Sequence, residues 1–351
     1  MSSKNTSRPV GVVGAGSFGT AIANLLTENS QRVILYVRDQ TKSKQIAETR
    51  VSAGQKLSDR ISITNSLQEI GEECHVIFPV VPSANFREMM QNLSPHLRPY
   101  HILIHGTKGF DLRLPDKPFS GRNPMTRAHV RTMSEVIKEE SSVVRVGCMA
   151  GPNLAREIAD HKPAATVIAS QFNEVVEVGQ RLLKNDRFLI YGGNDLIGAE
   201  LSGILKNIIA VGAGMIHGLG LGENARALLI SRGLVEMIHV GRALGGNIQA
   251  FLGLAGVGDL IATCGSSLSR NFTVGQKLAE GMKMEAIIAG MEEVAEGVKT
   301  IDIIHELARS YKVRCVINEM LYKVIHDDLT VADAQHLLMK LPFRQEVDFL
   351  E

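Results

Sequence analysis

The sequence predicts an N-terminal doubly wound α/β domain over residues 1–193, followed by an all-α domain over residues 194–351. Short β-branched runs alternate with amphipathic segments through the first half, a pattern typical of a mainly parallel sheet with helices on both faces. Beyond residue 193 the strand-like runs stop and helical periodicity continues to the end of the chain. A length of 351 residues exceeds one ordinary domain and favours two.

The expected strands are continuous apolar runs, because both faces of a covered parallel sheet are buried. They span residues 9–13, 32–37, 75–81, 101–106, 143–149, 164–170 and 187–193. Helical patterns such as SFGTAIANLLTEN, NFREMMQNL and VRTMSEVIKEE lie between them. The basic, Pro-containing stretch 111–127 interrupts the alternation, and we expect it to be a long exposed loop between a strand and a helix.

The second half opens with the apolar stretch 201–222, in which Lys206 is the only formally charged residue. The stretch is long enough to suggest a transmembrane helix. Lys206 and Asn207 near its middle, and dense glycines at its end, favour a buried helix of a soluble protein instead. Helical periodicity returns in ARALLISRGLVEMIHVGRAL, TVGQKLAEG and VKTIDIIHELARSY. We therefore expect no membrane insertion.

The composition is that of an ordinary soluble protein, with 44% hydrophobic and 21% charged residues. A formal net charge of +1 gives no reason to expect a nucleic acid or an anionic membrane as partner. The four cysteines are scattered without metal-ligand spacing, which favours free buried thiols in a reducing compartment. Because the N-terminus has no apolar signal region, we expect a cytoplasmic protein.

A glycine-rich turn follows the first expected strand and opens the first expected helix. Gly14, Gly16 and Gly19 have the G-x-G-x-x-G spacing of a dinucleotide-binding turn in a Rossmann-like domain. The first glycine permits the tight turn, the second admits a pyrophosphate to the backbone, and the third lets the helix pack on the strand. The alternative is a tight strand–helix turn with no ligand.

The end of the second strand carries Arg38 and Asp39, which bear on the choice of cofactor. An acid here commonly binds the ribose hydroxyls of NAD, whereas an arginine accommodates the 2′-phosphate of NADP. Since Arg38 comes first after the apolar run, we expect a site that accepts NADP as well as NAD. The alternative is a solvated charged pair.

Two further strand ends carry polar groups, at the edge where sheets of this type bind ligands. Lys108 follows the strand at 101–106 within GTKG, and AGPN (150–153) follows another strand and starts a helix. The alternative for Lys108 is a solvated loop charge, which is the more common case for a lysine after a strand.

The helical half contributes Asp259, between glycine and apolar residues, and the run Ser269-Arg270-Asn271 at an expected helix start. A serine N-cap offers free backbone N–H groups beside a fixed cation and an amide, a combination that suits a phosphate dianion. The alternatives are an ordinary N-cap with a surface arginine and, for Lys206, a lysine that snorkels from a helix edge.

Together these features resemble the NAD(P)-dependent glycerol-3-phosphate dehydrogenase family. GAGSFGTA is similar to that family's GAGSWGTA turn, with Phe18 in place of tryptophan. GTKG, AGPN, ELSGILKNIIAVGAG, GVGDLIATCGSSLSRN and EEVAEGV follow in the family's order, so the resemblance covers essentially the whole chain.

The resemblance implies roles for the matching positions. Lys206 would transfer the proton, with Asp259 as its electrostatic neighbour in the substrate pocket. The implied substrate contacts are Lys108, Gly151, Asn153, Lys206, Asp259, Ser269, Arg270 and Asn271, the last three chiefly for the phosphate. The implied cofactor contacts are Gly14, Gly16, Ser17, Phe18, Gly19, Arg38, Lys108, Ala155, Arg270, Val294 and Glu296.

The chain departs from the family pattern in two places. The family turn usually reads Gly-Pro-Ser or Gly-Pro-Thr, and Asn153 replaces that hydroxyl. The 111–127 loop is longer than the usual spacing after TKG, so it is either an inserted lid or a surface elaboration.

The implied reaction explains an ammonium group in an apolar helix. Hydride addition to the carbonyl of dihydroxyacetone phosphate builds negative charge on oxygen, which a lysine can stabilise and protonate. Burial lowers the pKa of a lysine and a carboxylate raises it, so Lys206 near Asp259 can be tuned between the two effects.

Further expectations follow from the resemblance: a homodimer, a small phosphate substrate, and a supply of glycerol 3-phosphate for glycerophospholipid synthesis. The main alternative is a related two-domain dehydrogenase acting on a β-hydroxy acid or a ketopantoate-like substrate. A non-catalytic dinucleotide-binding protein is a second alternative, although it has no use for Lys206, Asp259 and the phosphate-binding run together.

Overall fold

The computed structural model describes residues 8–113, 119, 124–291 and 295–340. The chain divides into two compact units: unit 1 comprises Met1–Thr107 and Met133–Leu196, and unit 2 comprises Lys108–Thr132 and Ile197–Glu351. The continuous part of unit 2 thus begins close to the expected boundary at 193. Lys108–Thr132, which the sequence-based division leaves in the first domain, groups with the helical unit instead.

Unit 1 is built on an eight-stranded sheet with the order β12-β11-β10-β7-β6-β1-β2-β5. Its strands are β1 (Val10–Val13), β2 (Val33–Tyr36), β5 (Ile61–Thr64), β6 (Val76–Pro79), β7 (Ile102–His105), β10 (Arg145–Ala150), β11 (Ala164–Ser170) and β12 (Phe188–Gly193). All neighbouring strands are parallel except β10 and β11, which are antiparallel. The expected mainly parallel sheet is confirmed, and β5 is an additional edge strand that the sequence pattern did not reveal.

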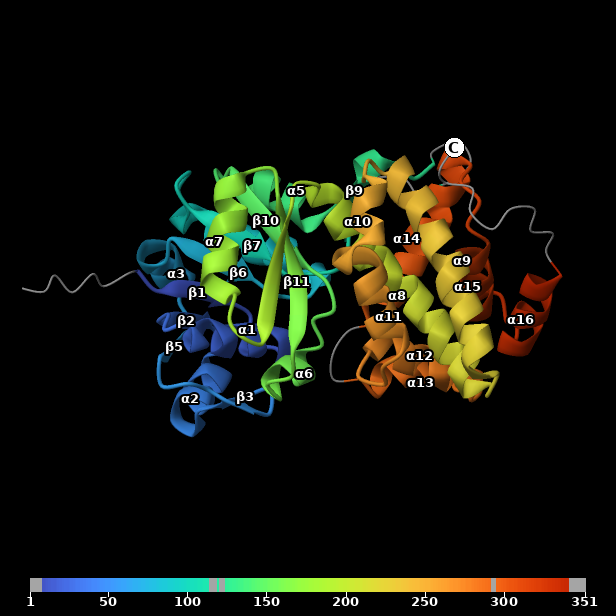
Figure 1. Ribbon diagram of the computed structural model, residues 1–351, viewed down its shortest axis with the longest axis horizontal. Coiled ribbons are helices and arrows are strands. Elements are labelled where there is room, and N and C mark those ends of the chain that lie inside the picture. Colours follow the sequence, from blue (N-terminus) through green and yellow to red (C-terminus); the bar gives the residue numbers. More distant parts are fainter. Residues whose placement is uncertain (1–7, 114–118, 120–123, 292–294, 341–351) are drawn as a thin grey trace, which may run out of the picture. The chain divides into compact units, whose positions relative to one another are not determined.

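Helices cover both faces of this sheet (Figure 1). One buried cluster joins the strands to α1 (Ser17–Glu28), α2 (Gln40–Thr49), α6 (Ala155–Ala159) and α7 (Asn173–Leu183). A second cluster joins them to α3 (Leu67–Glu73), α4 (Ser83–Leu93) and α5 (Met133–Glu140). The domain is therefore doubly wound, as predicted. A short hairpin of β3 (Val51–Ser52) and β4 (Gln55–Lys56) follows α2.

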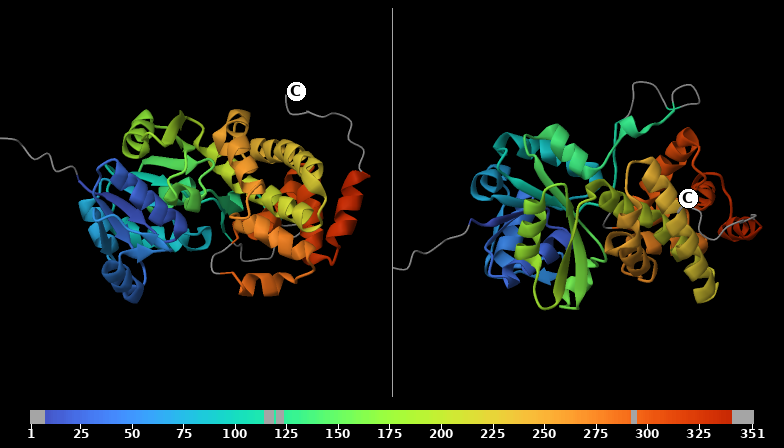
Figure 2. Two further views of the ribbon diagram at one scale, coloured as in Figure 1. Left: turned by 60° about the horizontal axis from the view of Figure 1, so that its bottom comes forward. Right: turned by 45° about the horizontal axis from the view of Figure 1, so that its top comes forward.

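Among the residues that the structure describes, unit 2 is helical apart from one short hairpin. Its helices are α8 (Leu196–Gly218), α9 (Gly222–Ala243), α10 (Ile248–Leu252), α11 (Asp259–Cys264), α12 (Arg270–Ala279), α13 (Met284–Ala289), α14 (Glu296–Tyr311), α15 (Val316–His326) and α16 (Val331–Met339). A π-helical turn, Leu254–Gly258, leads into α11. Figure 2 shows the yellow, orange and red helices of this unit gathered together, and one buried apolar cluster joins α8, α9, α14 and α15.

Helix α8 is the centre of unit 2. By length and composition it could cross a membrane, yet 94% of its most apolar window is buried within the structure. Residues 199–215 are buried throughout, and one apolar cluster joins α8 to α9, α12, α14 and α15. A helix that is apolar on every side is expected in such a core position.

The stretch expected as an exposed loop is anchored in unit 2. β8 (Asp111–Leu112) pairs with β9 (Val130–Arg131), and Phe110, Met125 and Val130 are buried in the helical core. The prediction of an exposed loop is therefore wrong for the described ends of the stretch 111–127, because Leu112 packs against this core and Met125 is buried in it. Residues 114–118 and 120–123 lie outside the described part of the chain.

Candidate active site

The glycine turn of unit 1 has the tight backbone that the sequence predicts. Gly14 has φ of +120°, and a Cβ atom there would lie 2.5 Å from the Val80 carbonyl oxygen. At Gly19 a Cβ atom would lie 1.9 Å from the Gly14 carbonyl oxygen, so only glycine lets α1 start this close to β1. Gly16 is the N-cap residue of α1 and makes no side-chain cap. The first amides of α1 can therefore receive an anion such as a pyrophosphate.

The β3–β4 hairpin, which the sequence did not predict, supports this glycine turn through two hydrogen bonds. The Ser52 hydroxyl donates to the Ala15 carbonyl oxygen over 3.3 Å, and the Gln55 amide donates to the Ser17 carbonyl oxygen over 3.1 Å. Phe18, the residue that departs from the family turn, lies against Gly106, where a Cβ atom would be 2.7 Å from its ring. A glycine at the end of β7 thus leaves room for an aromatic residue in the turn.

Arg38 and Asp39 have different surroundings. Arg38 is exposed directly after β2. The Asp39 carboxylate accepts a hydrogen bond from the Lys42 N–H over 2.6 Å and caps the start of α2. Asp39 therefore has a structural task that a solvated charged pair would lack, and Arg38 stays a prediction for cofactor binding.

The turn after β10 holds Gly151, Asn153 and Ala155. Gly151 has φ of +140°, which favours glycine. The Asn153 amide donates to the Thr166 hydroxyl over 2.8 Å, and that hydroxyl donates to the Ala150 carbonyl oxygen over 2.9 Å. The buried Asn153 Oδ1 atom has no hydrogen-bond partner within the part of the chain that the structure describes. Thr166 thus fixes the orientation of the side chain that replaces the family's hydroxyl.

In unit 2, Lys206 is buried with an exposed fraction of 5% and meets a carboxylate from another helix. Its Nζ atom lies 3.0 Å from Asp259 Oδ1 and donates to the Thr263 hydroxyl. Asp259 and Thr263 are four residues apart on α11 and therefore share one face of the helix. The Thr263 hydroxyl donates in turn to Asp259 Oδ1 over 3.2 Å. Three polar side chains thus satisfy one another in an apolar core.

Lys108 joins this group from the segment that leaves β7. Its Nζ atom lies 2.5 Å from Asp259 Oδ2, so one carboxylate holds two ammonium groups. The Asn207 amide donates to the Lys108 carbonyl oxygen over 3.3 Å and fixes the backbone at that point. Lys108 is therefore no solvated loop charge. Two cations on one carboxylate leave a net positive charge, which suits an anionic oxygen.

The surroundings of Lys206 change its proton affinity. Burial lowers the pKa of Lys206 from 10.5 to about 8, with Asp259 acting to raise it and Lys108 acting to lower it. The ammonium group is thus poised between its acid and base forms near neutral pH. Burial also raises the pKa of the neighbouring Cys264 thiol to about 12, so this cysteine is no nucleophile.

The expected phosphate-binding run lies at the start of α12. Ser269 is the N-cap residue, and its hydroxyl accepts a hydrogen bond from the Phe272 N–H over 3.3 Å. The Asn271 Oδ1 atom accepts a hydrogen bond from the Gly297 N–H over 2.9 Å. Gly297 lies at the start of α14, and a Cβ atom there would be 2.8 Å from the Asn207 carbonyl oxygen. The start of α14 is therefore close to Asn207, the residue that follows Lys206.

The structure therefore brings together part of the expected site within each unit. Lys108, Lys206 and Asp259 form one cluster of unit 2, and Asn271 lies beside the same stretch of α8. The glycine turn, Arg38, Gly151, Asn153 and Ala155 belong to unit 1. Glu296 is the first residue of α14, whereas Val294 lies outside the described residues. Sequence reasoning missed Thr263, although its spacing from Asp259 was a usable signal.

Comparisons with known proteins identify the family of this chain. The N-terminal model of NAD-dependent glycerol-3-phosphate dehydrogenase matches residues 9–176, and the C-terminal model matches residues 195–336. A glycerol-3-phosphate dehydrogenase [NAD(P)+] from Ectopseudomonas mendocina is 38% identical over 347 residues, 98% of this chain and 97% of the relative.

Solved structures give the same result. A glycerol-3-phosphate dehydrogenase from Coxiella burnetii has a TM-score of 0.85 at 30% identity, over 96% of this chain and 100% of that chain. A ketopantoate reductase from Ralstonia eutropha has a TM-score of 0.54 at 13% identity, over 93% of this chain and 99% of that chain. The second likeness shows a common fold alone, so the ketopantoate-like alternative has less support.

Proposed function

The chain belongs to the NAD-dependent glycerol-3-phosphate dehydrogenase family, and on this premise we propose that it interconverts sn-glycerol 3-phosphate and dihydroxyacetone phosphate. The cofactor is NAD or NADP. The observation that supports the proposal most strongly is the buried cluster of Lys206, Asp259 and Thr263, with Lys108 on the same carboxylate. The working protein is a cytoplasmic homodimer that supplies glycerol 3-phosphate for glycerophospholipid synthesis.

The residues of unit 1 fit a dinucleotide. A Cβ atom at Gly14 or Gly19 would collide with backbone carbonyl oxygens, so these glycines keep the turn tight, and the start of α1, which has no side-chain cap, faces the position of a pyrophosphate in such folds. When bound, the nicotinamide ring supplies the hydride to the substrate carbon or accepts it. Arg38 and Ala155 of unit 1, and Glu296 and Arg270 of unit 2, are the further side chains that we assign to cofactor binding.

Lys206 carries the proton. In the reduction, the carbonyl carbon of dihydroxyacetone phosphate gains the hydride, and the carbonyl oxygen takes the electron pair of the broken π bond. The Lys206 ammonium donates a proton to that oxygen and becomes an amine. In the oxidation, the amine takes the hydroxyl proton while the hydride leaves the carbon. Asp259 and Thr263 hold Nζ in one place during both steps.

The other polar groups hold the substrate. We assign Lys108, Gly151 and Asn153 to substrate binding, and Ser269, Arg270 and Asn271 chiefly to the phosphate of the substrate. An arginine with helix-start N–H groups is well suited to a dianion.

One steady-state assay tests the proposal. Dihydroxyacetone phosphate should oxidise NADH, NADPH or both, whereas ketopantoate and a panel of β-keto acids should give no more than background. The two cofactors measured side by side also determine the preference. Turnover of a keto acid without turnover of dihydroxyacetone phosphate would exclude the assignment and favour the ketopantoate-like alternative.

A further inference from the structure

The N-termini of two helices of unit 2, α12 and α14, lie close together and are joined by a hydrogen bond. α12 starts at Arg270 and α14 starts at Glu296. The Gly297 N–H donates to Asn271 Oδ1 over 2.9 Å. Gly297 lies in the first turn of α14, where backbone N–H groups have no carbonyl partner inside the helix. The bond therefore satisfies an amide of α14 with a side chain of α12.

This bond also determines which way the Asn271 carboxamide points. A carboxamide has an accepting oxygen at one end and a donating NH₂ group at the other. With Nδ2 turned toward Gly297, two donors would face each other, so the oxygen must occupy that position. No hydrogen bond within the described part of the chain uses Nδ2. Asn271 is 8% exposed, so its side chain has little freedom to turn.

The close approach requires a glycine at 297. A Cβ atom there would lie 2.7 Å from Asn271 Oδ1 and 2.8 Å from the Asn207 carbonyl oxygen on α8. Both distances are shorter than carbon–oxygen contacts allow, so a methyl group must displace the carboxamide or the start of α14. Asn207 directly follows Lys206. The crossing of α8, α12 and α14 thus places Asn271 relative to the proton-transferring lysine.

We propose that Gly297 is a positioning residue whose N–H turns the Asn271 carboxamide so that Nδ2 donates to the substrate phosphate. The inference rests on the proposed function, because it takes Ser269, Arg270 and Asn271 as the phosphate site. A phosphate dianion accepts hydrogen bonds and repels oxygen, so the orientation of this carboxamide decides whether it attracts or repels the substrate. Gly297 acts through Asn271 and touches no reacting atom.

Kinetics of Gly297→Ala test this proposal. We expect kcat/KM for dihydroxyacetone phosphate to fall about 10- to 100-fold, mainly through KM, as for the loss of a hydrogen bond to a charged group. Dihydroxyacetone, which lacks the phosphate, should react at a nearly unchanged rate, and the NADH dissociation constant should stay nearly constant. Gly290→Ala is the matched control, since a Cβ atom there would meet only ordinary contacts at 3.5 and 3.7 Å.

A double-variant cycle separates positioning from general damage. If Gly297 acts through Asn271, then adding Gly297→Ala to Asn271→Ala should lower kcat/KM no further. Additive losses would overturn the proposal, as would equal losses on the phosphorylated and the unphosphorylated substrate. A wild-type protein that does not turn over dihydroxyacetone phosphate would instead reject the proposed function itself.

Asn271→Asp provides a second test if Gly297→Ala does not fold. This variant keeps an oxygen for the Gly297 N–H and replaces Nδ2 with a second carboxylate oxygen. We expect a melting temperature close to that of the wild type, together with a loss of kcat/KM for dihydroxyacetone phosphate of at least the same size. Normal kinetics on the phosphorylated substrate would show that no donor is needed at this position and would refute the inference.

Discussion

At the scale of single residues, the Lys206 ammonium group can be buried in an apolar helix because side chains of another helix pair with it. Asp259 supplies the opposite charge and Thr263 an accepting hydroxyl, both from α11. The sequence marks Lys206 by its isolation and Asp259 by its apolar neighbours. It does not mark Thr263, because a threonine in a helix is common and only the folded arrangement brings it to Nζ.

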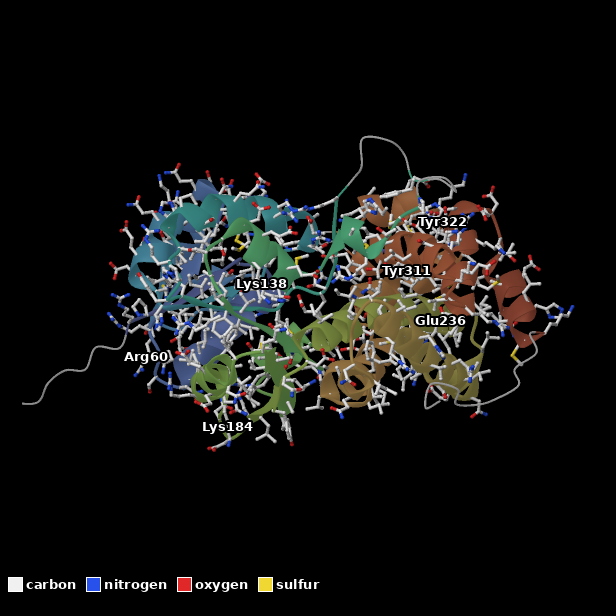
Figure 3. All side chains as sticks on the ribbon, turned by 90° about the horizontal axis from the view of Figure 1, so that it is seen from above. Arg60, Lys138, Lys184, Glu236, Tyr311 and Tyr322 are labelled. Carbon is white, nitrogen blue, oxygen red and sulfur yellow. The ribbon has the colours of Figure 1, made fainter. Side chains whose placement is uncertain are left out.

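Replacing Lys206 tests its proposed role. Lys206→Met keeps most of the side-chain volume and leaves Asp259 paired with Lys108. We expect a folded protein that binds NADH normally and turns over about 10²- to 10⁴-fold more slowly, because the acid–base group is lost. Turnover and NADH fluorescence titration measure the two effects. Lys138→Met, at an exposed lysine of α5 labelled in Figure 3, is the control and should behave as the wild type.

The lowered pKa of Lys206 predicts opposite pH profiles for the two reaction directions. Reduction needs the ammonium form, so its kcat/KM should be constant between the phosphate pKa near 6 and the Lys206 pKa of about 8, and should fall tenfold per pH unit above the latter. Oxidation needs the amine, so its kcat/KM should rise up to that pKa and then level off. Parallel profiles in both directions would contradict the assignment.

At the scale of elements, a partly buried carboxylate caps the start of one helix of unit 2. Glu236 on α9 accepts hydrogen bonds from the Ile317 and Asn318 N–H groups at the start of α15, each over 2.9 Å. Figure 3 labels this residue among the helices of unit 2. Burial raises the pKa of Glu236 to about 7, although the backbone hydrogen bonds act to lower it. The sequence gives no sign of this cap, because 80 intervening residues separate Glu236 from Ile317.

Removing this cap should loosen the helix. Glu236→Ala leaves two N–H groups without their acceptor, which we expect to cost about 1–3 kcal/mol in the free energy of unfolding. The folded-state pKa lies above the ordinary 4.5, so the contribution is full below pH 4.5 and declines as pH rises through about 7. Denaturant unfolding at pH 5 and pH 8 should therefore show the larger difference from wild type at pH 5.

A control on the same helix makes this measurement specific. Glu223 lies in the first turn of α9 with its side chain 77% exposed and forms an ion pair with Arg226 three residues on. Glu223→Ala should change the free energy of unfolding by about 0.5 kcal/mol or less, as is usual for exposed ion pairs. Equal effects of the two substitutions would mean that the cap contributes nothing beyond an ordinary surface charge.

Elements also show what a sequence pattern can predict. Continuous apolar runs identified seven of the eight sheet strands, because strands covered on both faces have no polar alternation. β5 was missed since Ser62 and Thr64 interrupt its apolar character at the edge of the sheet. The β8–β9 hairpin was missed because its strands are two residues long and the pairing spans distant positions.

At the scale of the whole molecule, the chain leaves the sheet after β7 to complete the helical unit. Lys108–Thr132 carries Lys108 to Asp259 and buries Phe110, Met125 and Val130 among the helices. The pattern of strands and helices gave the correct fold class, the resemblance gave the correct family, and Lys108 was a candidate because it follows a strand. The sequence did not reveal which unit holds this segment, because that depends on packing between parts of the chain far apart in sequence.

Phe110 offers a test of this link between packing and function. Its side chain is 2% exposed, two residues after Lys108. Phe110→Ala should cost about 3–5 kcal/mol in stability and also lower turnover, because the backbone that positions Lys108 loses its anchor. Phe110→Leu, which keeps most of the apolar volume, should retain much of both properties. Calorimetry measures the stability and steady-state kinetics the turnover. Unchanged turnover in a destabilised Phe110→Ala variant would show that Phe110 does not position Lys108.

The route of the chain also limits how the protein can be cut into pieces. A fragment that starts at residue 197 has every helix from α9 onward but lacks three apolar side chains of its own interior and one of its two carboxylate-bound cations. Expressed alone, such a fragment would present bare hydrophobic surface to water and tend to aggregate. A helical unit expressed alone therefore needs residues 108–132 fused through a linker to the segment that starts at residue 197. A simple truncation of the gene does not produce such a protein.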